Sequence, residues 1–364
     1  MGGRPEGHQI PPDPGRMGKA GQVAHQRAGS TWRNNASVPR RVTNDLLLGL
    51  LLAQVLGGVL GWALPVSAAA PLYDLHRALG VAVILLLGWK QAIALASLRR
   101  RLRRQPWDRS ILWGSVAASA LLLTLAIGLA WTLNLISFDL LWGYSPMNVH
   151  VALGIGLLPF VGWHMLKRRR QNAVTAPALS RRAALRVGGL GIATLVGWQA
   201  IERLAPAVRL TTGSKPAVSL SGNAFPAEIW LFDSVPTLDA TAYRLRVRSR
   251  AFSMDELLAA HPPRQVQAVL DCTSGWWSEQ VWTGVSVVDV LRSADVPADG
   301  GDIAIVSTTG HRIVLPIADL ADAVLATHVG GEALSAAHGY PLRLVVPGRR
   351  GYHWVKWVAA IDVV

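Results

Sequence analysis

Long apolar segments alternate with short basic clusters along the first half of the chain. Four segments approach or exceed the ~20 apolar residues that cross a bilayer as a helix: residues 46–66, 78–98, 111–136 and 149–166. A fifth apolar segment, residues 187–201, is shorter. From about residue 205 the pattern changes to short runs typical of β-strands. We therefore predict a membrane α-helical bundle of four to five transmembrane helices, followed by a domain of another fold class.

The positions of lysine and arginine predict the orientation of these helices. Basic residues concentrate in three places: the first 41 residues, residues 99–104, and residues 167–170 followed by Arg181-Arg182. Cytoplasmic loops carry the excess of Lys and Arg, and the intervening loops, residues 67–75 and 137–148, contain neither. We expect a multi-pass protein of the cell membrane with a cytoplasmic N-terminus and an extracytoplasmic C-terminal domain.

The composition agrees with a membrane protein. The 364 residues have a mean hydropathy of +0.30, 51% of them are hydrophobic, and the formal net charge is +14. Because the arginines fall in the predicted cytoplasmic segments, we expect the lipid bilayer as a partner and no nucleic acid. Residues 1–45 are rich in Gly, Pro, Arg and Gln without an apolar period, so we predict a disordered basic cytoplasmic tail.

A basic linker, residues 167–204, connects the four-helix region (residues 46–166) to the C-terminal domain (residues 205–364). Its twin arginine, Arg181-Arg182, precedes a Gly/Ala-rich apolar stretch. This pattern resembles a twin-arginine export signal, here internal. The alternative is an ordinary fifth transmembrane helix with a basic flank. Both interpretations place the residues that follow outside the cytoplasm.

Two histidines fall at the outer starts of the second and fourth apolar segments. His76 and His150 begin the matching sequences His-Arg-Ala-Leu-Gly and His-Val-Ala-Leu-Gly, whose glycine would leave room for a flat macrocycle. Ligands to cofactors in helix bundles come from facing helices, so we predict a haem b held by both imidazoles. The alternative is a pair of interfacial histidines at helix ends. The segments resemble four-helix membrane b-type cytochromes.

A second haem has less support. His164 follows His150 by 14 residues, which is about 21 Å along a helix. The matching position on the second apolar segment is occupied by Lys90 instead of a histidine. His164 is therefore a weaker candidate for an iron ligand.

The C-terminal domain reads as a mixed α+β fold. Its predicted strands are residues 242–247, 266–270, 303–306, 312–315, 342–346 and 355–363. Two helix-like segments, residues 253–260 and 287–294, interrupt these strands, and Thr309-Gly310 marks a turn.

The single cysteine of the chain, Cys272, lies in the sequence Val-Leu-Asp-Cys-Thr-Ser-Gly-Trp-Trp. One cysteine excludes an intramolecular disulfide and any zinc site of paired cysteines. Three roles stay open for it: a small buried apolar residue, a nucleophile, or a thiolate ligand to a metal that the rest of the protein holds.

Three motifs that follow this cysteine form a more specific pattern. The string Trp-Thr-Gly-Val-Ser-Val-Val-Asp-Val-Leu begins at Trp282, ten residues after Cys272. Later come His-Gly-Tyr-Pro-Leu-Arg, residues 338–343, and Pro-Gly-Arg-Arg-Gly-Tyr-His-Trp-Val-Lys, residues 347–356. In this order and spacing they resemble the sulfite oxidase-like molybdopterin domain.

That resemblance implies a molybdenum–molybdopterin cofactor, with Cys272 as the catalytic thiolate ligand of the metal. A soft sulfur donor suits such a centre. The resemblance also implies a set of residues that hold the pterin and its phosphate: Asn223, Phe225, Thr308, His338, Arg343, Arg350, Gly351, Tyr352, His353, Val355 and Lys356. Guanidinium and ammonium groups in this set would pair with the phosphate.

The implied activity is oxygen-atom transfer, either reduction of an S-oxide or N-oxide or oxidation of a sulfur compound. Electrons would pass through the haem to or from the quinone pool or another membrane partner. The neutral residues after Cys272 offer no arginine set for sulfite, which favours a small-molecule or methionine-sulfoxide-type substrate. The sequence ends at Val364, so we expect no immunoglobulin-like dimerisation domain. The alternative function is a cofactor-free, membrane-anchored binding module derived from the same fold.

Overall fold

The computed structural model describes residues 40–104, 109–138, 144–171, 181–205, 209–229, 233–297 and 301–364. Most of the predicted N-terminal tail, residues 1–39, lies outside these ranges. The same holds for residues 172–180 of the predicted linker and for residues 139–143 of the second predicted outer loop.

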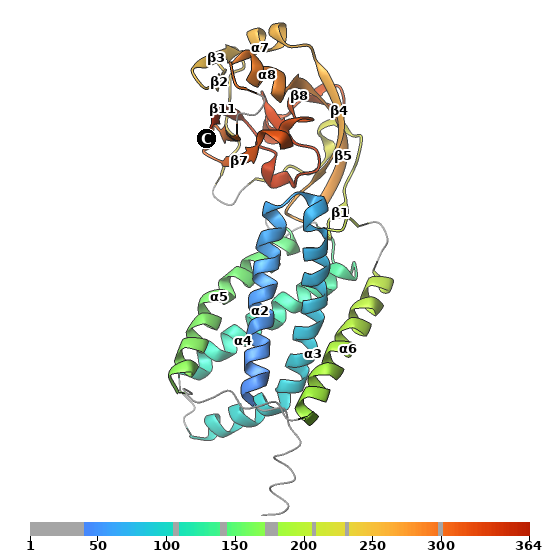
Figure 1. Cartoon of the computed structure of the whole chain (residues 1–364), viewed down its shortest axis with the longest axis vertical. Coiled ribbons are helices and arrows are strands. Elements are labelled where there is room, and N and C mark those ends of the chain that lie inside the picture. The colour runs from blue at the N-terminus through green and yellow to red at the C-terminus, as the bar shows by residue number, and fades with distance from the viewer. Residues whose placement is uncertain are drawn as a thin grey trace, which may run out of the picture.

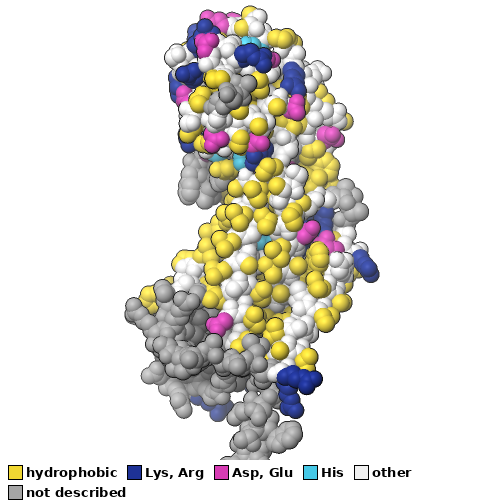
Figure 2. All heavy atoms as spheres, viewed as in Figure 1, with side chains coloured by type: hydrophobic (Ala, Val, Ile, Leu, Met, Phe, Trp, Pro, Cys, Tyr) yellow, Lys and Arg dark blue, Asp and Glu magenta, His cyan; other side chains and the backbone are white. Residues whose placement is uncertain are grey.

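The described residues of the N-terminal part form five long helices. They are α2 (Arg40–Ala63), α3 (Val66–Arg104), α4 (Arg109–Thr132), α5 (Pro146–Gln171) and α6 (Arg181–Leu204). Each contains a window long and apolar enough to cross a membrane. Large hydrophobic side chains are exposed along them, Trp163 at 73% and Leu56 at 61%, and Figure 2 shows such side chains covering the visible face of the helices. The prediction of a helical membrane region is confirmed, with five candidate spans.

The helix boundaries differ from the sequence prediction. Helix α2 already begins at Arg40, so residues 40–45 of the predicted disordered tail, residues 1–45, are helical, and α4 ends at Thr132 although the predicted apolar segment runs to residue 136. Residues 67–75 are helical rather than a loop, because α3 already begins at Val66. Alanines at positions 68–70 favour a helix, and Pro71 is accommodated near its N-terminal end. His76 therefore lies inside α3 and not at its start. The fifth apolar segment is also longer than predicted, since α6 spans 24 residues.

The helices pack in pairs. Helix α2 lies against α3, α4 lies against α5, and α6 lies against α3. At the end nearest the C-terminal domain, Arg77 of α3 forms an ion pair with Glu202 of α6 at 2.9 Å and donates a hydrogen bond to the Thr211 carbonyl at 2.9 Å. Glu202 also pairs with Arg209. These contacts fix α6 and the segment after it against α3.

The C-terminal part contains two sheets. The first has the order β3 (Arg250–Ser253), β2 (Arg244–Val247), β11 (Val358–Val363), β6 (Asp302–Ser307) and β7 (Arg312–Pro316). The second has the order β1 (Lys215–Pro216), β5 (Trp276–Ser286), β8 (Val324–Val329) and β10 (Arg343–Val345), with β4 (Arg264–Asp271) on β5 and β9 (Glu332–Ala333) on β8. The β11–β2 and β1–β5 pairs are parallel, and the other pairs are antiparallel.

Short helices connect these strands. Helix α7 (Met254–Ala260) starts at a capping box between Ser253 and Glu256, and α8 (Val287–Ser293) starts at Ser286, whose side chain accepts from the Asp289 amide. Four 3₁₀ turns complete the domain: η1 (Gly222–Ala224), η2 (Ile317–Leu320), η3 (Ala336–His338) and η4 (Gly351–His353). Buried residues of both sheets and of α8 form one continuous core.

The predicted strands and both predicted helices are present, with shifted ends. The strands β1, β3, β5, β8 and β9 are additional. The longest of them, β5, escapes prediction because buried polar side chains, Ser278 and Gln280, and a buried glycine, Gly284, interrupt its apolar pattern.

The C-terminal domain sits on the end of the helices at which α2 turns into α3 (Figure 1). The Val66 amide donates to the Gly348 carbonyl at 3.1 Å, and Arg349 Nη1 donates to the Ala63 carbonyl at 3.1 Å. On the neighbouring helix pair, Trp131 Nε1 donates to the Gly213 carbonyl at 2.9 Å. Hydrogen bonds at both helix pairs thus fix the position of the domain.

The position of Gly284 yields a test of this strand packing. A Cβ there would lie 2.0 Å from the Leu325 carbonyl oxygen and 2.5 Å from Ala326 Cα. We expect Gly284→Ala to destabilise the domain by about 3 kcal/mol, because backbone of β8 would have to move. Calorimetric unfolding of the full chain in detergent measures this. The control Thr283→Ala alters a half-buried neighbour and should change stability far less. An unchanged transition temperature in Gly284→Ala would contradict the observed β5–β8 contact.

Candidate functional site

Cys272 opens a tight turn between β4 and β5. Its amide donates to the Trp276 carbonyl at 2.8 Å, and the Gly275 amide donates to the Cys272 carbonyl at 3.0 Å. Gly275 has a φ of +92°, a conformation that favours glycine. Burial raises the pKa of the Cys272 thiol to about 11, although the residue retains some exposed surface. The turn therefore holds the thiol at a fixed place at the end of β4.

The turn η4, from the last sequence motif, lies directly against this cysteine. A Cβ on Gly351 would lie 3.3 Å from Cys272 Cα and 3.1 Å from Leu270 Cδ1. This separation is tighter than ordinary packing, so the absence of a side chain at Gly351 allows the approach. Two predicted site residues far apart in the sequence are thus brought together.

A buried guanidinium lies in the same region. Arg343 is 3% exposed, and its Nη1 donates to the His338 carbonyl at 2.9 Å. Its guanidinium carbon lies 5.2 Å from the centre of the Trp282 ring. Burial lowers the pKa of Arg343 to about 10, while Cys272 acts to raise it. Arg343 Nε is buried and has no hydrogen-bond acceptor among the residues that the structure describes.

A second cation lies near the first. Lys356 Nζ donates to the Glu228 and Ala337 carbonyls, each at 2.7 Å. Burial, together with the charge of Arg343, lowers the pKa of Lys356 to about 7. Within the described ranges, neither cation donates a hydrogen bond to a carboxylate. A buried charge is costly unless an opposite charge accompanies it. The two side chains therefore fit an anionic group such as a phosphorylated cofactor.

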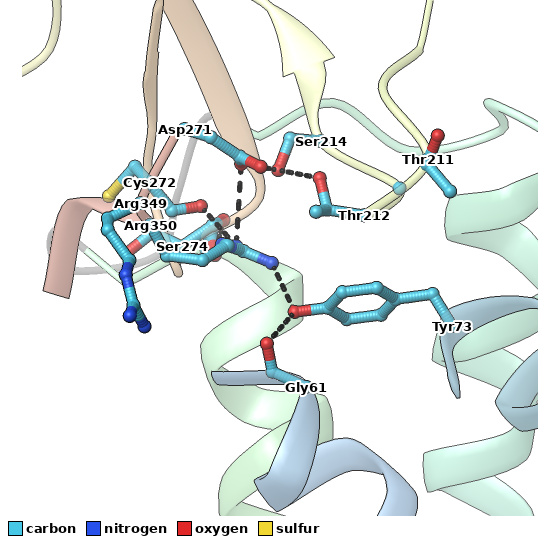
Figure 3. A network of polar contacts seen from close by, with 12 residues as sticks. Gly61, Tyr73, Thr211, Thr212, Ser214, Asp271, Cys272, Ser274, Arg349 and Arg350 are labelled. Carbon is cyan, nitrogen blue, oxygen red and sulfur yellow. Dashed lines mark hydrogen bonds and ion pairs between the residues drawn. The ribbon is translucent and has the colours of Figure 1, made fainter. Parts of the chain in front are cut away.

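Arg350 has a different environment from the other two cations. Its Nη2 donates to the Cys272 carbonyl at 2.8 Å, its Nη1 donates to the Tyr73 hydroxyl at 2.9 Å, and it lies 3.5 Å from an Asp271 carboxylate oxygen. In Figure 3 the sulfur of Cys272 points away from this network. Arg350, predicted from the sequence to bind the cofactor, is thus placed on the backbone side of the cysteine.

Three predicted residues connect η1 with η3. His338 Nε2 donates to the Phe225 carbonyl at 3.0 Å, and its Nδ1 lies 2.7 Å from Ser335 Oγ, so both ring nitrogens have protein partners. Burial lowers the pKa of His338 to about 4. Phe225 is buried in the core, and Asn223 bonds to the Ala333 carbonyl and the Ser335 amide. These contacts give the three residues a structural role.

The remaining predicted residues differ in burial. His353 is 5% exposed, its Nδ1 has no partner within the described ranges, and burial lowers its pKa to about 4. Val355 is buried, and its carbonyl accepts from the Leu344 amide at 2.8 Å. Tyr352 is half-buried in η4, whereas Thr308 is exposed on the turn between β6 and β7. Of this group, His353 offers the clearest unused donor or acceptor.

Several residues of the site were missed by the sequence reasoning. Ser214 Oγ donates to Asp271 at 2.6 Å, on the same carboxylate that faces Arg350. Glu228 interacts electrostatically with Cys272 and Lys356, and burial raises the pKa of Glu228. Only Asp271 carried a sequence signal, an acidic residue between an apolar strand and the cysteine.

The predicted histidine pair also comes together. The ring centres of His76 and His150 are 6.1 Å apart, with 70° between the ring planes. His76 Nδ1 donates to the Gln54 carbonyl of α2 at 3.0 Å, and His150 Nδ1 donates to the Thr124 carbonyl of α4 at 2.9 Å. Residues of four helices thus orient the two imidazoles. In each ring Nδ1 bonds to a backbone carbonyl, and Nε2 is the second nitrogen that could bind a metal. The side chain of His164 lies outside the described residues.

Comparison with known proteins identifies the C-terminal domain. Residues 232–364 match the family model described as oxidoreductase molybdopterin binding domain. Sulfite oxidase from Gallus gallus is 29% identical over 169 residues, which cover 35% of this chain and 36% of that protein. Inducible nitrate reductase [NADH] 2 from Glycine max is 29% identical over 158 residues, 33% of this chain and 17% of that protein.

Among solved structures, the sulfane dehydrogenase SoxCD from Paracoccus pantotrophus matches with 27% identity and a TM-score of 0.33, over 35% of this chain and 40% of that chain. That superposition is too weak to support a fold argument. The chain spans 36% of the length of the Gallus gallus protein and 17% of the length of the Glycine max protein. Their similarity concerns one part of the protein. Residues 232–364 are an oxidoreductase molybdopterin-binding domain with sulfite oxidase-like relatives, on a chain that also carries five candidate membrane-spanning helices.

Proposed function

We propose that this protein is a membrane-anchored molybdenum-dependent oxidoreductase that performs oxygen-atom transfer, with electrons relayed through a membrane haem b. The reaction is reduction of an S-oxide or N-oxide, or oxidation of a sulfur compound. The observation that carries this proposal is Cys272 on a fixed turn, close enough to two cations, the buried Arg343 and the half-buried Lys356, for charge interactions. A cofactor-free binding module would gain nothing from burying those charges.

The residues divide into distinct roles. Cys272 would hold molybdenum through its thiolate, and Arg343 and Lys356 would face the anionic part of molybdopterin. His353, whose Nδ1 has no partner within the described part of the chain, would hydrogen-bond an edge of the pterin. When bound, the molybdenum cofactor supplies the two-electron chemistry of oxygen-atom transfer. The protein supplies orientation and charge.

The surroundings of Cys272 favour a neutral substrate. The residues that follow it, from Thr273 to Trp277, carry no charge. Arg350 is held on the opposite side of the cysteine by Tyr73 and Asp271. A sulfite dianion would need cations directed toward it. An S-oxide or N-oxide, including the methionine-sulfoxide type, agrees better with this environment.

The histidine pair supports the haem. Imidazole nitrogens bind metals at about 2 Å, so two histidines that would hold the same haem iron must lie close together. The observed separation of His76 and His150 is 6.1 Å. Each Nδ1 already donates to a backbone carbonyl, a contact that orients metal-bound histidines through the other nitrogen. We propose one haem b at this pair.

We also propose the orientation and the division of the chain. The basic segments would lie in the cytoplasm, and the domain from about residue 205 onward would lie outside it. Arg181-Arg182, both exposed at the start of α6, would act as the twin-arginine-like element for its export. Electrons would enter from the quinone pool or another membrane donor, or leave to it.

The first test concerns Cys272. We expect purified wild-type protein to contain molybdenum and to reduce an S-oxide or N-oxide with a redox dye as electron donor. Cys272→Ser should lower this activity at least about 100-fold, because loss of a residue that only supports a metal ligand already costs about 10- to 100-fold. The dye-linked activity is measured in a screen of small S-oxides, N-oxides and sulfur compounds. The neighbour Thr273→Ala serves as the control. A wild-type protein without molybdenum, expressed where cofactor synthesis is intact, would instead favour the binding module.

The second test concerns the haem ligands. We expect His76→Ala and His150→Ala each to abolish the low-spin b-type absorption spectrum, because each variant removes one of the two imidazoles that would hold the haem iron. Redox spectra of the solubilised full chain measure this. His311→Ala, in the C-terminal domain, should leave the spectrum intact. A full low-spin spectrum in either helix variant would show that the ligand pair is different.

A further inference from the structure

One side chain from a membrane helix reaches the backbone of the catalytic cysteine through a single intermediate. Tyr73 lies three residues before His76 on α3, so the two share a helix face about 4.5 Å apart along the axis. The Tyr73 hydroxyl accepts a hydrogen bond from Arg350 Nη1 at 2.9 Å, and Arg350 Nη2 donates to the Cys272 carbonyl at 2.8 Å. Figure 3 shows the continuous chain of contacts.

The surroundings fix this chain of contacts in one arrangement. The Tyr73 hydroxyl also donates to the Gly61 carbonyl at 2.8 Å. A Cβ on Gly61 would lie 2.9 Å from Tyr73 Cζ, so the ring occupies space that a side chain on α2 would fill. The side chains of Arg350 and Asp271 are each 4% exposed, and Ser214 donates to Asp271 at 2.6 Å. Water therefore has little access to the Arg350 end of the link, whereas Tyr73 is half-buried.

A second contact joins the same cysteine turn to the other histidine helix. Ser145 Oγ, just before α5, donates to the Ser274 carbonyl. His150 lies five positions after Ser145 in the sequence. The contact reaches the turn two residues beyond Cys272, whereas the Tyr73–Arg350 contact reaches the carbonyl of Cys272 itself. The route through Tyr73 is thus the more direct one.

We infer that Tyr73 and Arg350 form the electronic and mechanical link between the haem-binding helix α3 and the molybdenum-binding cysteine. This inference rests on the proposed haem relay. The haem and the molybdenum cofactor, when bound, would supply the one-electron chemistry, and Tyr73 and Arg350 would connect the parts of the chain that hold them. Tyr73 and Arg350 keep their protons and are neither oxidised nor reduced, because they only provide hydrogen-bonded contact along the route. Tyr73 is a positioning residue, since it acts on Cys272 through Arg350.

The test measures electron transfer within the full chain without a substrate. A laser pulse on a flavin with a sacrificial donor produces a flavin semiquinone, which gives one electron to the haem. The following decay of the reduced-haem absorbance reports passage of that electron to oxidised molybdenum. We expect Tyr73→Phe to slow this decay, because the variant removes the hydrogen-bonded contact between α3 and Arg350. The haem spectrum should stay as in the wild type, because His76 and His150 are unchanged.

Two further variants test whether the rate of the decay depends on the Tyr73–Arg350 contact itself or on any contact that holds the domain against the helices. Ser145→Ala removes the hydrogen bond between the same turn and the start of α5, together with the contacts of Ser145 Oγ to Asn148, and it should leave the decay near the wild-type rate. Gly61→Ala keeps the tyrosine hydroxyl but displaces its ring, and it should slow the decay as Tyr73→Phe does. Equal slowing in Ser145→Ala and Tyr73→Phe would overturn the inference, because docking alone would then set the rate.

The proposed function and this inference fail in different ways. Wild-type protein without a haem spectrum or without molybdenum would overturn the relay and the route with it. Wild-type protein that transfers the electron, while Tyr73→Phe and Gly61→Ala transfer it equally fast, would overturn the route alone.

Discussion

The buried guanidinium of Arg350 is the interaction on which the arrangement of this protein depends. It contacts the Asp271 carboxylate, the Cys272 carbonyl and the Tyr73 hydroxyl, groups from two distant parts of the chain. A buried ion pair contributes little net stability, but removal of one partner is costly because the other is left as an uncompensated charge. Asp271 and Arg350 therefore specify one docked geometry, in which the cysteine turn lies above α2 and α3.

The same interface uses the ends of the membrane helices. The last carbonyls of a helix lack partners within the helix and carry partial negative charge. Arg349 donates to the Ala63 carbonyl at the end of α2, and Lys215 donates to the Ile136 carbonyl shortly after α4. Cations of the C-terminal domain thus satisfy carbonyls that would otherwise need water. The helices contribute to docking through their backbone, while their apolar side chains remain for lipid.

Much of this organisation is predictable from the sequence, and the exceptions have physical reasons. Length and apolarity predict the spans, and the motifs mark Gly351 as a candidate site residue, but the close approach of Gly351 to Cys272 is seen only in the folded chain. The strand β5 is hidden because polar residues such as Gln280 are buried and hydrogen-bonded there. Tyr73 carries no signal, since its role exists only once α3 meets the domain. The local pattern of apolar residues thus predicts helices and strands, whereas the role of a residue such as Tyr73 depends on contacts between distant parts of the chain.

Arg350 and Arg343 show why a motif cannot assign the role of a basic residue by itself. Both are buried arginines from the matching segments, yet Arg350 faces Asp271 within the protein, whereas Arg343 has no carboxylate in hydrogen-bond contact within the described ranges. Lys356 is held likewise by carbonyls alone. A bound anionic group would relieve this excess of positive charge, and by mass action it would stabilise the folded domain.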